Sequence, residues 1–105
     1  MSMEAPDLLL GLLKVWVPEA AKAHRLVDRA LAEITVIAGG AEVYPARGTR
    51  VGSSGTVSEQ IHVYEWRGLT QETARTCISR VVAAMKVSGE HQVLYSYSAE
   101  MAWLI

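Results

Sequence analysis

The segment from Thr56 to Trp66 alternates between two kinds of side chain, and this alternation limits how the segment can be used in a fold. Successive side chains of a β-strand point to opposite faces of its sheet, so Ile61 and Val63 share one face. The other face carries a row of large, polar-tipped side chains: Gln60, His62, Tyr64 and Trp66. The sequence therefore predicts a strand with Ile61 and Val63 toward the core and this row, the aromatic row, on the opposite face.

Strand-like and helix-like patterns alternate along the rest of the chain. Pro18 ends an apolar extended run and suits the first position of a helix. Gly52-Ser53-Ser54-Gly55 is a turn signal that predicts a hairpin, and Thr70 is a suitable N-cap for a helix that ends near Gly89. The expected order is strand, helix, strand, strand, helix and strand, over Leu8–Val17, Pro18–Ile34, Ile34–Val51 with a bend at Gly39-Gly40, Thr56–Trp66, Thr70–Gly89 and Glu90–Ile105.

This βαββαβ order predicts an α+β, ferredoxin-like fold, in which two helices cover one face of a four-stranded antiparallel sheet. The strands over Leu8–Val17 and Thr56–Trp66 would lie in the middle of that sheet. The 105 residues suit a single domain over 1–105, with a flexible start over 1–6.

Composition excludes several classes of function. Ten Lys and Arg residues against 11 Asp and Glu give a net charge of −1 without a basic cluster, which argues against nucleic-acid binding. The apolar run over Leu8–Val17 is too short to cross a membrane, and Lys14 interrupts it. The single cysteine, Cys77, cannot form an internal disulfide, so we expect a cytoplasmic protein.

The second face of the predicted sheet is left without a helical layer. A monomer rarely exposes a contiguous apolar patch of more than a few hundred Å², so we expect a homodimer in which this face is covered by a second subunit. A small apolar or aromatic ligand enclosed there is a further expectation. Beyond Gln60 and Trp66, the expected interface or ligand-binding residues are Trp16, Tyr95 and Tyr97, with Trp103 as an alternative to the tyrosines.

The order of elements resembles that of the dimeric α+β barrel group. The resemblance implies two sheets that close around a cavity in which small molecules are bound or transformed. On this basis the alternative function is a small enzyme, with His62 as general acid or base and Tyr64 as a hydrogen-bond donor. A histidine that only makes interface hydrogen bonds is the simpler interpretation.

Other kinds of site have weaker support. Trp16, Tyr64 and Trp66 occupy strands that carry stacking aromatics in RNA recognition modules, but the basic, glycine-rich motif of those modules is absent. No cofactor and no metal site are expected, because the three histidines lie on different elements without metal-ligand spacing. Cys77 lies on an apolar helical stripe, which favours a buried small side chain over a nucleophile.

Overall fold

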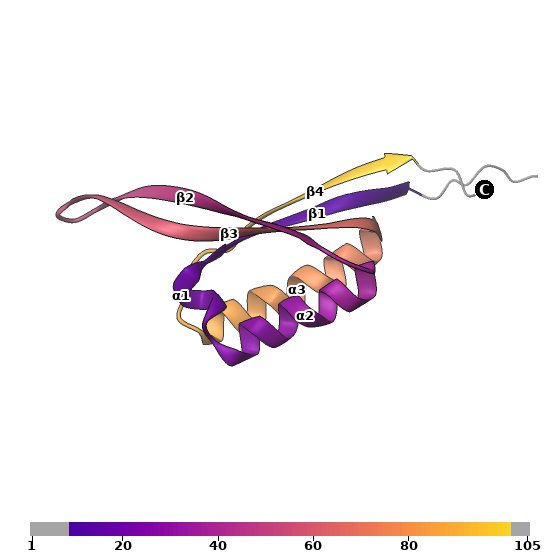
Figure 1. The fold of residues 1–105 in the computed structure, drawn as a ribbon, viewed down its shortest axis with the longest axis horizontal. Coiled ribbons are helices and arrows are strands. Elements are labelled where there is room, and N and C mark those ends of the chain that lie inside the picture. Colours follow the sequence, from indigo (N-terminus) through magenta and orange to yellow (C-terminus); the bar gives the residue numbers. More distant parts are fainter. Residues whose placement is uncertain (1–8, 102–105) are drawn as a thin grey trace, which may run out of the picture.

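A computed structural model describes residues 9–101 of the chain. Four strands form one antiparallel sheet in the order β2-β3-β1-β4, and the helices all lie on one side of it (Figure 1). The expected α+β, ferredoxin-like arrangement is confirmed at this level, while residues 1–6 and Trp103 lie outside the described part. The elements are β1 (Leu9–Pro18), α1 (Glu19–Lys22), α2 (Arg25–Ala38), β2 (Glu42–Gly52), β3 (Gly55–Thr70), α3 (Gln71–Val87) and β4 (Leu94–Met101).

The first helical region differs from the prediction in two ways. It consists of two helices, because the chain turns after α1 and His24 caps α2 by accepting a hydrogen bond at Nδ1 from the Leu26 N–H at 3.2 Å. The second helix also continues to Ala38, where an extended segment was predicted, and it ends at Gly39 with a left-handed φ of 81°. Burying Ile34 completely on the helical face outweighs the few tenths of a kcal/mol by which β-branched residues disfavour a helix.

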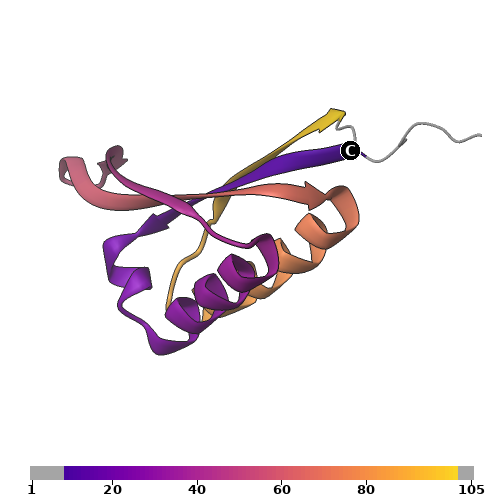
Figure 2. The ribbon, with the colours of Figure 1, turned by 45° about the vertical axis from the view of Figure 1, so that its right-hand side comes forward.

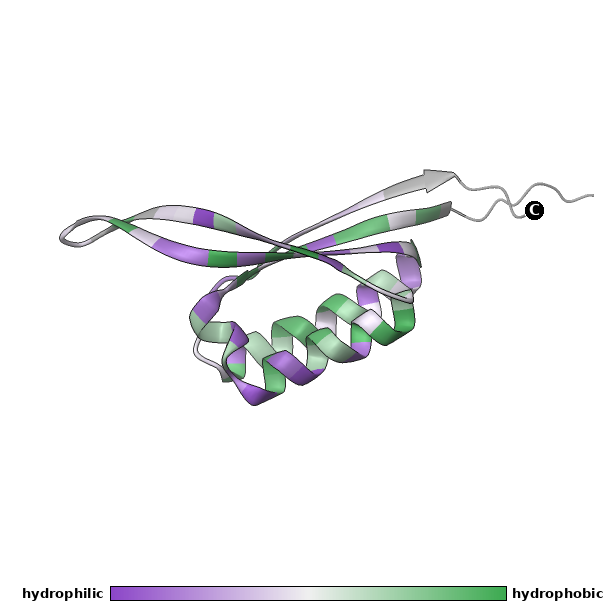
Figure 3. Ribbon diagram, viewed as in Figure 1, coloured by the Kyte–Doolittle hydropathy of each residue, from purple (hydrophilic) through white to green (hydrophobic). Residues whose placement is uncertain are grey.

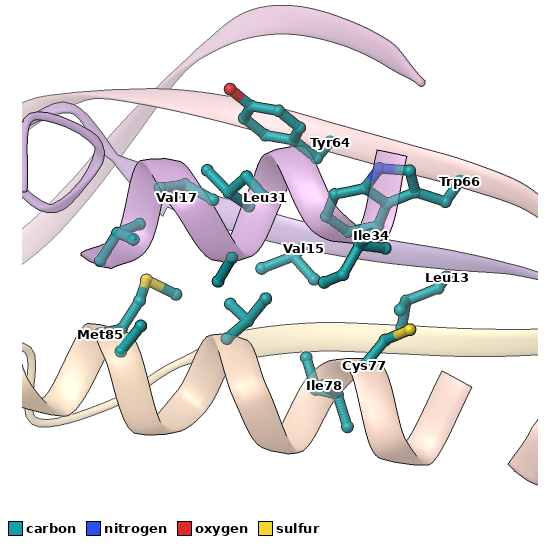
Figure 4. Packing of buried hydrophobic residues seen from close by; sticks show 14 of the residues in the cluster. Leu13, Val15, Val17, Leu31, Ile34, Tyr64, Trp66, Cys77, Ile78 and Met85 are labelled. Carbon is teal, nitrogen blue, oxygen red and sulfur yellow. The ribbon is translucent and has the colours of Figure 1, made fainter. Parts of the chain in front are cut away.

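The core lies between the helices and one face of the sheet. Leu13, Val15 and Val17 of β1 point toward the helices as predicted, each at most 1% exposed, and Figure 4 shows them packed with side chains from α2 and α3. Both helices carry alternating hydrophobic and hydrophilic residues (Figure 3), as expected for helices with one buried face.

The aromatic row faces the helices rather than the uncovered face, so its predicted orientation was wrong. In the β1–β3 register, Trp66 lies opposite Leu13 and Tyr64 opposite Val15, and side chains opposite each other share a face. Trp66 is 0% exposed, and its indole N–H donates to Thr35 Oγ1 of α2 at 3.0 Å. Burying two large aromatic rings removes more apolar surface from water than burying Ile61 and Val63, and the indole finds its hydrogen-bond acceptor there.

A bulge ends the central part of β3. The β1–β3 register shifts between Gly11 and Leu13, and Gly68 in the facing segment has a left-handed φ of 76°. An extra residue of this kind shifts the alternation of the strand, so Leu69 points into the core again, at 3% exposure. Thr70 then caps α3, as predicted, by accepting a hydrogen bond from the Thr73 N–H.

The β2–β3 hairpin projects beyond the helices (Figures 1 and 2). Strand β1 pairs with β3 only from Ile61 onward, so residues 55–60 of β3 pair with β2 alone. The predicted hairpin turn is confirmed, because Gly52 and Gly55 are register partners across Ser53-Ser54. Pro45 lies in β2, an edge strand of the sheet, which is where a residue without a backbone N–H is tolerated.

Candidate interaction surface on the uncovered sheet face

The uncovered face of the sheet is built from side chains of all four strands. Lys14 and Trp16 of β1 lie on it as predicted, because they alternate with the core residues of that strand. The register places these side chains beside partners from β3, β2 and β4 on the same face. These partners are Val63 and Glu65 of β3, Glu42 and Tyr44 of β2, and Leu94 and Ser96 of β4.

A cluster of charged and polar side chains is centred on Glu65. Its carboxylate accepts a hydrogen bond from the Tyr44 hydroxyl at 2.5 Å and lies 3.2 Å from Lys14 Nζ through the same oxygen, Oε2. Arg67 approaches the other oxygen at 3.5 Å and also donates from Nε to Glu42 at 3.2 Å. We call Lys14, Glu42, Tyr44, Glu65 and Arg67 the Glu65 cluster.

Glu65, Tyr44 and Lys14, at the centre of this cluster, each stabilise the ionisation state that the others have at neutral pH. The Tyr44 hydroxyl, followed by Lys14, lowers the pKa of Glu65 below its ordinary value. The hydrogen bond to Glu65 raises the pKa of Tyr44 and likewise that of Lys14. The carboxylate, the ammonium and the neutral phenol are therefore all favoured near pH 7, and none is prepared to exchange a proton there.

Apolar side chains border the cluster. Val63 is only 1% exposed although no helix covers it, because Trp16 and Tyr44 lie opposite it on the two neighbouring strands. Lys14 Nζ lies 5.5 Å from the centroid of the Trp16 ring, within the range of a cation–π contact. Leu94, which lies opposite Trp16 on β4, is 63% exposed. The face thus combines accessible apolar surface with a charged centre.

The structure separates the predicted site residues. Tyr64 and Trp66 stack in the core with ring centroids 5.5 Å apart, while Trp16 lies on the opposite face of the sheet. Gln60 is exposed on the part of β3 that pairs only with β2. A catalytic pair of His62 and Tyr64 stays a prediction: His62 Nε2 lies 3.8 Å from Glu19 of α1, and Tyr64 is only 9% exposed.

Sequence reasoning missed Glu65 and Tyr44. Glu65 lies between two aromatics of the row, and a carboxylate in that position is the signal that its face carries a polar partner. Tyr44 precedes Pro45, and a proline in a strand-like run indicates a sheet edge or an irregular segment without indicating which face its neighbour occupies. The Lys14 side chain, by contrast, was correctly predicted to lie on this face.

Tyr95 and Tyr97 lie on the helix-facing side of β4. The register places Tyr95 opposite Val15 and Tyr97 opposite Leu13, two core residues of β1. The Tyr97 hydroxyl donates to the Leu69 carbonyl at 2.7 Å. The two tyrosines are therefore separated from Trp16 by the sheet itself.

The remaining sequence-based candidates are also placed. Cys77 is buried in the helical layer, and its burial raises the pKa of the thiol, which disfavours the nucleophilic thiolate. Within residues 9–101, no three His, Cys, Asp or Glu side chains are grouped so that they could hold a metal ion. None of the helices described is long and apolar enough to cross a membrane.

Comparison with known proteins gives a likeness of fold. No family model matches the chain, and no curated protein matches it. A solved structure of a Bacillus cereus protein related to NIF3 is similar over 93% of this chain, with 17% identity and a TM-score of 0.56, although this chain spans only 27% of that one.

Two further solved structures are similar over most of their length. CutA from Synechococcus elongatus matches 94% of this chain and 81% of its own, with 13% identity and a TM-score of 0.50. A phage SAM lyase in complex with S-methyl-5'-thioadenosine matches 97% of this chain and 95% of its own, with 12% identity and a TM-score of 0.51. At these identities the likeness confirms the expected resemblance at the level of the fold alone.

Proposed function

We propose that the protein is a homodimeric interaction module that uses the uncovered sheet face as its interface. The observation that carries the proposal is that Trp16 and exposed Leu94 border the Glu65 cluster, on the sheet face that none of the described helices covers. Tyrosine and tryptophan suit the centre of an interface, because each buries a large apolar area and keeps a polar tip.

A second copy of this chain is the partner that fits the charges of the face. A two-fold interface brings the same patch of both subunits together, so a patch with net charge of one sign would repel itself. The Glu65 cluster contains two cationic residues, Lys14 and Arg67, and two anionic ones, Glu42 and Glu65. Its net charge is therefore zero, and self-association brings no like-charged excess together.

The projecting hairpin supports the same proposal. An isolated two-stranded ribbon is marginally stable in water, and among the described strands β2 is the one that pairs with residues 55–60 of β3. Val57 pairs with Arg50 in the β2–β3 register and is 38% exposed. By alternation along the strand it lies on the same side of β3 as Val63, so it extends the uncovered face along the hairpin. A second subunit packed on this face supports the hairpin as well, in the manner of a dimeric α+β barrel with ferredoxin-like βαββαβ subunits.

The proposal does not extend to catalysis. His62 lies 3.8 Å from Glu19 of α1 and Tyr64 belongs to the core cluster, so the surroundings of these two residues favour an interaction module over the alternative, a small enzyme with His62 as general acid or base. We place the module in the cytoplasm, where a buried, unpaired Cys77 stays reduced.

Light scattering of the purified chain tests the dimer. We expect twice the monomer mass at tens of micromolar, roughly the range in which a micromolar interface is populated. Trp16→Glu introduces a charge into the apolar part of the proposed interface and should give a folded monomer. Val36→Glu is the matched control, because Val36 is 80% exposed on α2 and belongs to the helical layer. A monomeric wild type, or equal loss of the dimer in both variants, contradicts the proposal.

A further inference from the structure

A groove lies between α3 and β4, on the helix-facing side of the sheet. It opens to solvent and has a volume of about 200 Å³, roughly the room of seven liquid water molecules at about 30 Å³ each. This is enough for one or two fused rings. The groove is lined by Leu13 of β1, by Gln71, Ala74, Arg75 and Ile78 of α3, and by Tyr95 and Tyr97 of β4.

The floor of the groove is apolar and continuous with the core. Leu13 is 1% exposed, Ala74 3% and Ile78 8%. The alanine leaves room between the helix and the strand, and β4 is the outermost strand on this side of the sheet. A flat apolar molecule that enters the groove therefore meets packed hydrocarbon, without displacing a side chain from the core.

One wall of the groove is held in place by a hydrogen bond. The Tyr97 hydroxyl donates to the Leu69 carbonyl at 2.7 Å, which links β4 to the residue before the cap of α3. The Tyr97 ring is thereby fixed beside the floor. A wall that is fixed before binding reduces the entropy that a ligand loses in ordering its site.

The rim of the groove carries a cation and hydrogen-bonding groups. Arg75 follows Gln71 by one helical turn, so both side chains are on the same side of α3. Arg75 forms no ion pair with any other side chain in the described part of the chain. Tyr95, at 48% exposure, lies across the groove from them.

We propose that this groove binds a small planar aromatic molecule that carries a carboxylate. The ring packs on Leu13, Ala74 and Ile78 beside Tyr97, and the carboxylate accepts hydrogen bonds from the Arg75 guanidinium, whose planar fork matches a carboxylate. The Tyr95 hydroxyl is a second donor at the rim. The groove is on the helical side of the sheet, so the site does not depend on self-association through the uncovered face.

A matched pair of probes tests the proposal. The full-length protein is titrated with 2-naphthoate and with neutral 2-naphthamide, and backbone amide shifts are followed by ¹H–¹⁵N NMR. We expect saturable shifts at Ala74, Arg75 and Ile78, and a naphthoate affinity about threefold to fivefold above that of the amide, the effect of one partly exposed ion pair.

Two variants of α3 separate the groove from general charge attraction. Arg75→Gln should reduce the affinity for 2-naphthoate to that for 2-naphthamide and leave the affinity for 2-naphthamide unchanged. Arg80→Gln is the control, because Arg80 lies on the same helix but approaches Glu33 of α2 at 4.0 Å, and it should change neither affinity. No shifts in the groove up to about 10 mM, a limit for the weakest specific sites, or equal affinity of the two probes, overturns the proposal. The titration is repeated with Trp16→Glu, which should remove the dimer and leave the groove intact. This comparison distinguishes a failure of groove binding from a failure of the proposed dimer.

Discussion

The hydrogen bond between Trp66 and Thr35 offers the most direct test of the orientation of β3. Trp66 is completely buried, and its indole N–H has Thr35 Oγ1 as its acceptor at 3.0 Å. Thr35→Val keeps the size and branching of the side chain but leaves the buried N–H without a partner. The cost of an unpaired buried donor is about 1–3 kcal/mol, which lowers the midpoint of thermal unfolding by roughly 5 °C per kcal/mol in a domain of this size.

A second threonine on the other long helix provides the control. Thr35 Oγ1 also donates to the Leu31 carbonyl at 2.8 Å, and Thr76 makes the same kind of bond to the Glu72 carbonyl at 3.2 Å on the exposed side of α3. Thr76→Val removes only such a backbone contact and should change stability by about 0.5 kcal/mol or less.

The coupling between the two residues completes the experiment. Urea unfolding followed by circular dichroism gives the unfolding free energies of wild type, Thr35→Val, Trp66→Phe and the double variant. In the Trp66→Phe background no indole N–H is left unpaired, so Thr35→Val should cost about 1 kcal/mol less than in the wild type. A coupling near zero, or equal costs for Thr35→Val and Thr76→Val, refutes the orientation in which Trp66 contacts α2.

Two further predictions concern the sheet. The pKa of Glu65 is lower in the folded protein than its ordinary 4.5, so the unfolded chain binds the proton more tightly. Wild type should therefore be more stable than Glu65→Gln at neutral pH, and this advantage should shrink as the pH falls below about 4.5 toward the folded pKa, as measured by urea unfolding over a series of pH values. An advantage that does not depend on pH contradicts the assignment. Gly68→Ala should cost about 1–2 kcal/mol in the same assay, because a Cβ disfavours the left-handed φ of 76° at the bulge. Unchanged stability would mean that the bulge relaxes without cost.

Local signals in the sequence were sufficient for most of the fold. Pro18, Thr70 and the Gly52–Gly55 turn each have a specific backbone requirement, and all three mark real boundaries between elements. The end of α2 was misplaced because Thr35-Val36-Ile37 is a β-branched run, which favours a strand only weakly. In the structure Val36 and Ile37 are exposed, while Thr35 accepts a hydrogen bond from Trp66 and Ala38 packs against the core.

The face of β3 is a different kind of error. Alternation determines which residues share a face, but the direction of the strand relative to the helices depends on register and volume. Both faces of β3 carry apolar groups, and the space between the sheet and the helices is filled by Tyr64 and Trp66 together with Leu13 and Val15. Only the pairing with β1 decides this, and pairing between distant segments is not encoded in a single strand.

The uncovered sheet face carries Glu65 in place of the aromatic row, and this changes which groups an interface would have to bury. With Glu65 at its centre, covering this face removes a charged carboxylate from the remaining water, and an unpaired buried charge would oppose association strongly. Both oxygens of Glu65 already have partners within the same subunit, from Tyr44, Lys14 and Arg67. The desolvation of the carboxylate is thus largely complete in one subunit, at 11% side-chain exposure, and a second copy adds apolar burial around Trp16 and Leu94 without having to supply a new counter-ion. Weakening the cluster should therefore weaken association as well as stability, so Lys14→Gln is expected to shift the dimer toward monomer at constant pH.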